Sequence, residues 1–238
     1  MKGYVSVGSE VSYELHSALL VYKRSAHHGN DDVFITRHDV KKDEGGVPVL
    51  GPGETLTMEF VSDLMRAFQG KLDTQVLPEN VLVHSFQRIV WWVPPAIRTM
   101  FYAAGRSPEL EQLSGKRYPQ PALLFDVSDG GLRIRALESS VRPNADTPLF
   151  RAPYWNVNDG GSVCLGDTRT PDSGGVASLK QWETAFFESA FTHQNAQHRL
   201  TTHPAGFVGL WRELAGKKSF PSRYLASSKQ TLGDYLSH

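Results

Sequence analysis

The chain contains one cysteine, Cys164, within residues 153–167, which read PYWNVNDGGSVCLGD. Asn156 lies eight positions before it, and residues 158–162 between them are Asn, Asp, Gly and Ser. Because these residue types bond their own backbone or adopt positive φ, the run should reverse the chain and bring Asn156 back towards the thiol. A thiol beside an amide suits acyl transfer through a thioester. The sulfur would be the nucleophile, and the amide would donate hydrogen bonds to an oxyanion.

Each candidate residue also has a structural interpretation. A free cysteine is often a small buried hydrophobe, although the glycine-rich context of Cys164 favours an exposed loop. Asn156 beside a turn would bond backbone in one interpretation and an oxyanion in the other, and the two are compatible. Asp167 and Asp172 follow the cysteine and would orient or deprotonate an incoming amine, or would simply be solvated. Exchange between thioesters is nearly balanced in free energy, so it needs access and orientation more than a strong base.

Three histidines, His193, His198 and His203, recur every five residues and raise the question of a zinc site. Five residues turn about 140° around a helix, so one helix cannot present all three together. Their spacing is not a zinc-ligand pattern. The sequence therefore predicts neither a metal site nor a cofactor.

The composition is that of a folded protein without a strong charge bias. The 238 residues are 40% hydrophobic, which is enough for a sizeable core, and 25 basic residues balance 25 acidic ones. Nucleic-acid binding driven by net charge is not supported. A single cysteine excludes an intrachain disulfide and fits a reducing cytosol. No signal core and no apolar run near the roughly 20 residues of a membrane span is present, so we expect a soluble, cytoplasmic protein.

The first part of the chain reads as β-structure. Residues 3–22 show short alternating stretches typical of two strands, and 33–36 form a third. Residues 41–53 are rich in charge and glycine, which predicts a boundary there. We therefore expect a β-rich extension over residues 1–50 and a second domain over 51–238.

The second part mixes helices and strands. Apolar residues at helical spacing, capping residues and glycine stops predict its helices. These are expected over residues 57–70, 94–104, 107–115, 178–190, 207–216 and 224–236. Strands are expected over 81–93, and a hairpin over 121–127 and 132–137. This order of elements predicts an α+β fold.

The stretch around Cys164 resembles the ubiquitin-conjugating enzymes, which carry His-Pro-Asn, a few polar turn residues and then Gly-Ser-Ile/Val-Cys-Leu. Here Asn156 and residues 161–165 fall at that spacing, while Tyr154 and Trp155 stand in place of His-Pro. Further stretches resemble a bacterial branch of that superfamily, the PRTRC system protein B group (prokaryotic ubiquitin-conjugating-like family D). These stretches are residues 77–81, 91–94, 182–193 and 203–212.

The resemblance implies a ubiquitin-conjugating-like fold, an antiparallel meander sheet flanked by helices, here with the N-terminal β-rich extension. It also implies that Cys164 takes a ubiquitin-like protein as a thioester and passes it to an amine, with Asn156 and Asp167 as catalytic residues. The implied setting is a bacterial, plasmid-associated system with a ubiquitin-like protein, a ThiF-type activating enzyme, a JAB-type metalloprotease and a ParB-related protein.

Two other functions remain open from the sequence. The loss of His-Pro before Asn156 favours a non-catalytic scaffold that keeps the fold and binds the same partners. A papain-like thiol hydrolase would pair Cys164 with His193 or His203, although the signature expected around such a cysteine is absent.

Overall fold

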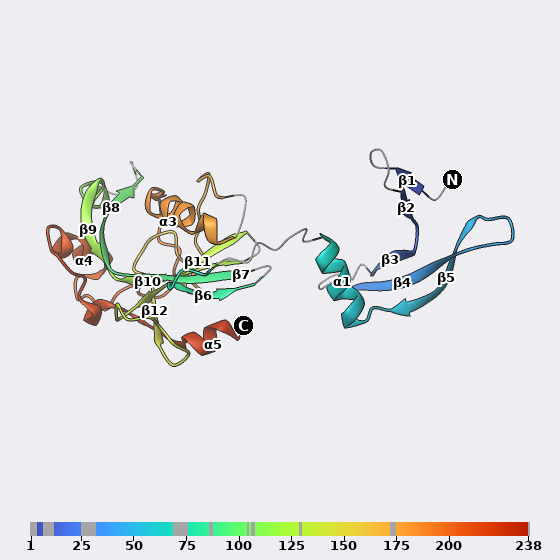
Figure 1. Ribbon diagram of the computed structural model, residues 1–238. Helices are drawn as coiled ribbons and strands as arrows, with labels where there is room; N and C mark the ends of the chain where they lie inside the picture. The colour runs from blue at the N-terminus through green and yellow to red at the C-terminus, as the bar shows by residue number, and fades with distance from the viewer. Residues whose placement is uncertain are drawn as a thin grey trace. The chain divides into compact units, whose positions relative to one another are not determined.

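The structure is a computed structural model that describes residues 4–6, 12–24, 32–68, 76–85, 88–103, 105, 108–128, 130–171 and 175–237. The chain forms two compact units, Met1–Gln75 and Val76–His238 (Figure 1). The boundary predicted at residue 50 falls inside a strand, β5 (Pro48–Thr55), which pairs with the strand before it. The division therefore lies later in the chain than the glycine-rich stretch predicted.

The first unit contains a hairpin and a three-stranded antiparallel sheet. The hairpin pairs β1 (Tyr4–Ser6) with β2 (Ser12–Glu14). A third strand begins at Ser17, so residues 3–22 do not hold only the two strands predicted. The sheet has the order β3-β4-β5, with β3 spanning Ser17–Arg24 and β4 spanning Asp32–Lys42.

The strand β5 was not predicted, because its glycines are typical of a loop. Nδ1 of His38, on β4, lies 2.8 Å from the carbonyl oxygen of Gly51. A Cβ at Gly53 would lie only 3.0 Å from the His38 ring. The glycines of β5 therefore leave room for a buried histidine on the neighbouring strand.

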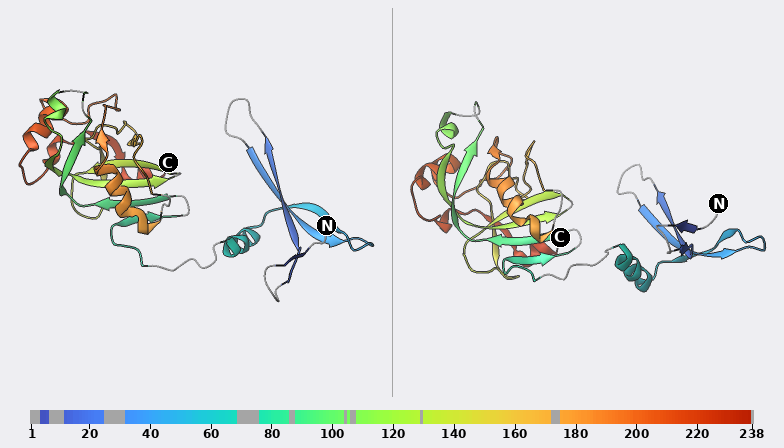
Figure 2. Two further views of the ribbon diagram at one scale, coloured as in Figure 1. Left: turned by 90° about the horizontal axis from the view of Figure 1, so that it is seen from above. Right: turned by 45° about the horizontal axis from the view of Figure 1, so that its top comes forward.

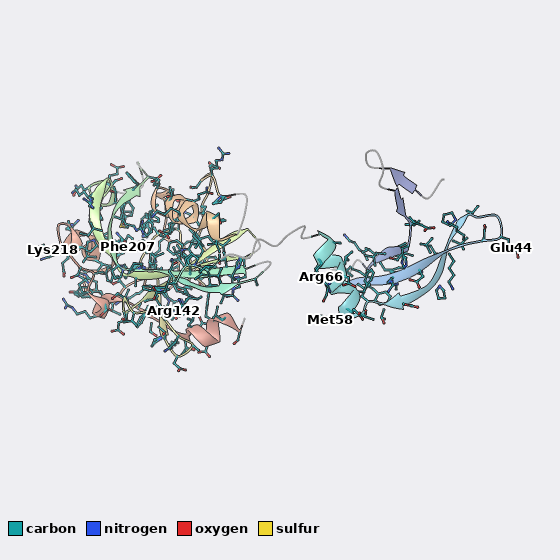
Figure 3. The ribbon with its side chains drawn as sticks, in the orientation of Figure 1. Glu44, Met58, Arg66, Arg142, Phe207 and Lys218 are labelled. Carbon is teal, nitrogen blue, oxygen red and sulfur yellow. The ribbon has the colours of Figure 1, made fainter. Side chains whose placement is uncertain are left out.

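The helix predicted from Thr57 is confirmed as α1 (Met58–Phe68). The Thr57 hydroxyl accepts a hydrogen bond from the Phe60 N–H at 3.2 Å, which caps the first turn. The Arg37 guanidinium of β4 lies 4.8 Å from the centre of the Phe60 ring. Met58 and Arg66 of this helix are exposed (Figure 3).

The second unit is built on a six-stranded antiparallel sheet whose strands neighbour one another in chain order. Its strands are β6 (Val81–His84), β7 (Arg88–Val93), β10 (Ala122–Ser128), β11 (Gly131–Leu137), β12 (Pro148–Arg151) and β14 (Ser227–Thr231). The predicted strands over 81–93 and the predicted hairpin are confirmed. The helix predicted over 224–236 is wrong for most of its length, since β14 pairs with β12 and a 3-10 turn, η2, covers Ser222–Tyr224.

A second sheet has the order β13-β8-β9, with β8 over Ala96–Tyr102, β9 over Lys116–Gln120 and β13 over Ala190–Phe191. The helix predicted over 94–104 is therefore wrong. Its apolar residues fit a helical period, but pairing of β8 with β9 decides the conformation, and exposed Phe101 alternates with buried Met100 and Tyr102. The helix predicted over 107–115 is confirmed as the short α2 (Pro108–Glu111).

The six-stranded sheet is covered on both faces. On one side, Trp91 and Phe125 pack with α3 (Leu179–Phe187) and α4 (Gly206–Leu214) in one core cluster. On the other, Val90 and Trp92 pack with α5 (Leu232–Leu236). The alternation of a strand places Trp91 and Trp92 on opposite faces, and α3 and α5 lie on opposite sides of the sheet (Figure 1, Figure 2).

Polar contacts fix α5 and the start of α3. Buried Asp126 of β10 accepts a hydrogen bond from the Tyr235 hydroxyl at 2.6 Å and pairs with Arg88 at 3.0 Å. The helix predicted over 178–190 was expected to be capped at its first residue, but the Ser178 hydroxyl donates instead to the Gly175 carbonyl within a 3-10 turn, η1 (Val176–Ser178).

The architecture is thus a mixed fold of antiparallel sheets and few helices, compatible with the ubiquitin-conjugating-like fold that the sequence predicted. Within the described ranges, none of the helices has both the length and the apolar character that crossing a membrane requires.

Candidate active site around Cys164

The predicted chain reversal before the cysteine is a tight hairpin. The Cys164 N–H donates to the carbonyl oxygen of Asn156 at 2.7 Å, and the Asn158 N–H donates to that of Ser162 at 3.0 Å. The Asn158 side chain accepts from the Ser162 N–H at 2.9 Å, as expected of an asparagine in a turn. Cys164 is exposed where the hairpin ends. The turn residues therefore bring Asn156 beside the cysteine, as the sequence predicted.

The returning arm of this hairpin is held against β11. The Val163 N–H donates to the Leu132 carbonyl at 2.9 Å, and the Ile134 N–H donates to the Gly161 carbonyl at 2.8 Å. Gly161 has φ +89°, and a Cβ there would lie 2.8 Å from the Ile134 oxygen. Glycine is therefore required at this position both by the backbone conformation and by the approach of β11.

Aromatic packing holds the segment that enters the hairpin. Tyr154 is fully buried, and its hydroxyl donates to Oε1 of Gln120 at 2.7 Å. The ring of Trp155 stacks on Phe207 with centroids 5.7 Å apart, and Phe207 is labelled in Figure 3. The indole N–H of Trp211 donates to the Pro153 carbonyl at 3.2 Å. Tyr154 and Trp155, which stand in place of His-Pro, are thus part of the core or packed against it.

The Asn156 side chain joins the hairpin to the segment after α3. Its Oδ1 accepts from the N–H and the hydroxyl of Thr192, at 2.9 and 3.0 Å, and from the His193 N–H at 3.3 Å. Its Nδ2 donates to the Ala190 carbonyl at 3.2 Å. The residue has φ +63°, a conformation that asparagine tolerates better than most residues. An amide nitrogen carries two hydrogens, so one remains without an acceptor in the described part of the chain.

A groove of about 980 Å³ runs past the thiol. One wall is the loop 165–171, and the other is formed by α3 and residues 188–192. Cys164, Asn156 and Asp167 all line this groove, so the structure brings the three predicted site residues together. Asp172 lies outside the described residues.

Charged side chains line the groove without partners of their own among the residues that the structure describes. Asp167 and Arg169 lie on the loop wall, Lys180 near the start of α3 and Glu188 directly after its end, and all four are exposed. None of their side chains makes a hydrogen bond or ion pair within the described ranges. The sequence did not predict that Glu188, Lys180 and Thr192 line the groove. No local signal marks them, because they reach the groove only through the packing of α3 and β13.

A family model described as Prokaryotic E2 family D matches residues 57–228. The chain belongs to this prokaryotic E2 family. No curated protein and no solved structure matches the chain. The matched region contains α1, the whole hairpin and the groove. Membership assigns the chain a ubiquitin-conjugating-like role in general terms.

The histidines of this family D member have separate partners. His203 is buried, with Nε2 2.8 Å from a carboxylate oxygen of Glu213, whereas His193 is exposed and bonded to the Thr192 hydroxyl. No hydrogen bond joins the Cys164 sulfur to a histidine in the ranges that the structure describes. Among the same residues, no group of three or more His, Cys, Asp or Glu side chains is placed to hold a metal ion.

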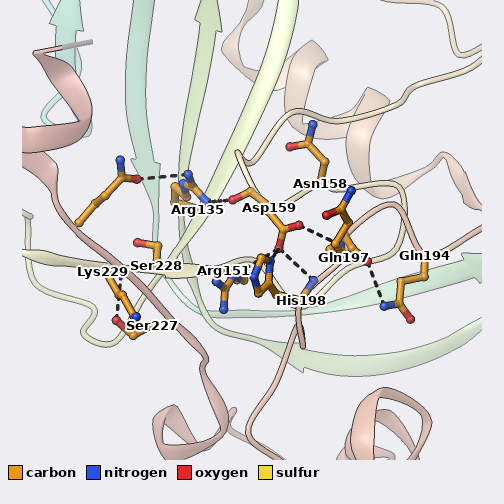
Figure 4. Close-up of polar contacts among 12 residues, drawn as sticks. Arg135, Arg151, Asn158, Asp159, Gln194, Gln197, His198, Ser227, Ser228 and Lys229 are labelled. Carbon is orange, nitrogen blue, oxygen red and sulfur yellow. Dashed lines mark hydrogen bonds and ion pairs between the residues drawn. The ribbon is translucent and has the colours of Figure 1, made fainter.

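Asp159, at the tip of the hairpin, is hydrogen-bonded to residues 197–198 (Figure 4). Its carboxylate accepts from the Gln197 N–H at 2.8 Å and lies 3.0 Å from Nδ1 of His198. Its backbone oxygen accepts from the buried Arg135 at 2.8 Å. Burial acts to raise the pKa of Asp159. This effect of burial is smaller than the combined effect of the hydrogen bonds that the carboxylate accepts from the N–H groups of Gln197 and His198 and from the His198 ring. The pKa of Asp159 therefore lies below its usual value.

Proposed function

We propose that Cys164 carries a ubiquitin-like protein as a thioester and passes it to an amine acceptor. The thiolate attacks the thioester carbonyl of the C-terminal glycine on an activating enzyme, and the enzyme's thiolate leaves. The acceptor amine then attacks the new thioester, loses a proton and displaces the Cys164 thiolate. The observation that carries the proposal is an exposed cysteine on an open groove, within the matched family region.

The neighbouring side chains support this chemistry in different ways. The unbonded amide hydrogen of Asn156 would donate to the oxyanion, while its other bonds hold the hairpin in place. Asp167, and with it Glu188, would attract the acceptor amine and take up its proton, because both carboxylates border the groove without partners in the described ranges. Among the described residues no base is bonded to the Cys164 sulfur, which is compatible with thioester exchange because that reaction needs orientation more than a base.

The partners of the proposed reaction follow from the resemblance described above. They are a ubiquitin-like protein and a ThiF-type activating enzyme, with a JAB-type metalloprotease as a further partner, in the plasmid-associated system of the PRTRC protein B group. We propose that the reaction takes place in the cytoplasm. It needs no cofactor bound to this chain and no direct contact with nucleic acid.

The direct test mixes the full chain with its cognate activating enzyme, the ubiquitin-like protein and ATP. We expect an adduct on a non-reducing gel that disappears on addition of dithiothreitol. Cys164→Ala should form none, and Cys164→Ser should form an ester that survives dithiothreitol but not hydroxide. An adduct that persists in Cys164→Ala, or no adduct with the cognate partners, would contradict the proposal.

A second candidate function is a non-catalytic scaffold. One observation favours it: the amide oxygen of Asn156 and one amide hydrogen are already hydrogen-bonded within the chain. In addition, aromatic residues stand in place of His-Pro before Asn156. The same experiment separates the two functions. A scaffold would co-purify with the activating enzyme and the ubiquitin-like protein but would never form the adduct.

A further inference from the structure

The groove beside Cys164 carries opposite charges at the two ends of α3. Lys180 is the second residue of this helix, and Glu188 directly follows its last residue. A helix rises about 1.5 Å per residue, so their backbones lie about 12 Å apart along the groove wall. The side chains of both have no hydrogen bond or ion pair within the described ranges. The groove is therefore polarised, and within the described ranges nothing in the chain neutralises the charges of Lys180 and Glu188.

The thiol lies near the acidic end. Cys164 is bonded to the Asn156 backbone, and the Asn156 amide is bonded to Ala190 and Thr192, just beyond Glu188. The start of α3, with Lys180, lies away from this point. The positive end of the helix dipole is also at the start of α3 and adds to the charge of Lys180.

A second cation lies on the opposite wall. Arg169 belongs to the loop that leads from Cys164 towards the start of α3, and it lines the same groove as Lys180. Arg169 also has no side-chain partner among the described residues. Both cations line one groove, with no carboxylate bonded to either in those ranges, and together they favour an acidic side chain over a basic one.

We propose that this groove selects a ubiquitin-like protein whose tail carries an acidic side chain about three or four residues before its terminal glycine. An extended chain spans about 3.3–3.6 Å per residue, so about 12 Å corresponds to three or four residues. With the terminal carbonyl at Cys164, the acidic side chain reaches Arg169 and Lys180. Gln181 and Thr184, between the two ends, offer polar groups to the tail backbone. This inference rests on the proposed function.

The test uses synthetic ten-residue peptides that end in Gly-Gly and carry a small alkyl thiol as a C-terminal thioester. The fourth residue from the end is Glu, Gln or Lys. The Cys164 thiolate attacks the peptide carbonyl and the alkyl thiolate leaves, so neither ATP nor an activating enzyme is needed. Mass spectrometry of the full chain gives the initial rate of loading. We expect the Glu peptide to load about two- to fivefold faster than the Gln peptide at low salt, with a smaller ratio at high salt.

Charge reversal identifies the residues responsible. Lys180→Glu and Arg169→Glu should each lower the ratio of the Glu rate to the Lys rate, and the double variant should invert it. Lys218→Glu, on an exposed loop after α4, makes the same change in net charge away from the groove and should leave the ratio unchanged.

Two failures would have different meanings. The groove does not select an acidic tail if all three peptides load at one rate, or if Lys180→Glu and Arg169→Glu leave the ratio of the Glu rate to the Lys rate unchanged. Thioester chemistry at Cys164 would still stand. If no peptide loads and the cognate partners give no adduct either, the proposed function fails, and this inference fails with it.

Discussion

The side-chain oxygen of Asn156 accepts hydrogen bonds from both the N–H and the hydroxyl of Thr192, at 2.9 and 3.0 Å. Asn156 begins the hairpin that carries the thiol, whereas Thr192 follows β13, far along the chain. This contact therefore joins the hairpin to the groove wall that contains Thr192 and sets the position of the hairpin relative to α3.

Replacing Asn156 by alanine should lower the free energy of unfolding by about 1–3 kcal/mol, because partly buried N–H and C=O groups of residues 190–193 lose their partner. Asn156→Gly is the matched variant, since it removes the same amide but accepts φ +63° without strain. It should be more stable than Asn156→Ala by about 1 kcal/mol. Urea unfolding measures both differences.

If the same amide stabilises the oxyanion, its removal should slow acyl transfer and leave the stability of the fold unchanged. A variant that melts like the wild type but transfers its acyl group about 10² times more slowly would show that the amide acts mainly on the transition state. We expect the structural effect to dominate, because the amide already makes four hydrogen bonds within the fold.

Gly161→Ala should distort the hairpin. The added Cβ would lie 2.8 Å from the Ile134 oxygen, at a residue with φ +89°. Gly166→Ala is the control, since Gly166 also has positive φ, +54°, but has open space around its Cβ position. The control should cost about 1 kcal/mol, and Gly161→Ala about 1–3 kcal/mol more. Thermal melting checks stability, and the rate of Cys164 labelling by an aromatic disulfide checks the hairpin. Equal losses of stability in Gly161→Ala and Gly166→Ala would show that β11 leaves room for a side chain at position 161.

The contribution of Asp159 to stability should depend on pH. Its pKa is lower in the folded state than its usual value of 3.8, so the stabilisation is fully present above about pH 4–5 and is lost as the pH falls through the folded pKa. The difference in unfolding free energy between the wild type and Asp159→Asn should therefore shrink below about pH 4. Urea unfolding of both proteins over this pH range measures the difference, and a difference that does not change with pH would contradict the prediction.

A fragment of residues 76–238 should fold by itself, because both core clusters and the groove lie within it. We expect cooperative urea unfolding and the thiol reactivity of the full chain. A fragment of residues 57–238, which starts where the family match starts, is the comparison. If only this longer fragment unfolds cooperatively, α1 belongs to the fold of the second unit.

The parts of the fold that sequence predicted well are those decided locally. The hairpin before Cys164, the cap at Thr57 and the turn between β10 and β11 all follow from residues a few positions apart. The β8 strand was mistaken for a helix because Ile97, Met100 and Phe101 fit a helical period. Only the distant partner β9 makes it a strand.

The candidate site divides in the same way. Cys164, Asn156 and Asp167 lie close together in sequence, so turn chemistry and a motif sufficed to bring them together. The opposite wall, with Lys180, Glu188 and Thr192, depends on how α3 packs on the sheet and on the pairing of β13 with β8. No spacing of residues in the sequence predicts the packing of α3 or the pairing of β13 with β8.

The bond from the Cys164 N–H to the Asn156 carbonyl, at 2.7 Å, has a consequence for inhibitors. In many thiol and serine hydrolases, the N–H of the nucleophile itself helps to bind the oxyanion. Here that N–H is already committed to the hairpin. A peptide aldehyde would therefore form a hemithioacetal whose oxygen lacks this donor, and it should bind Cys164 less tightly than such aldehydes bind those hydrolases. Compounds that capture the thiol irreversibly, such as a tail-like peptide ending in a vinyl sulfone, do not depend on that donor and should be the more effective probes.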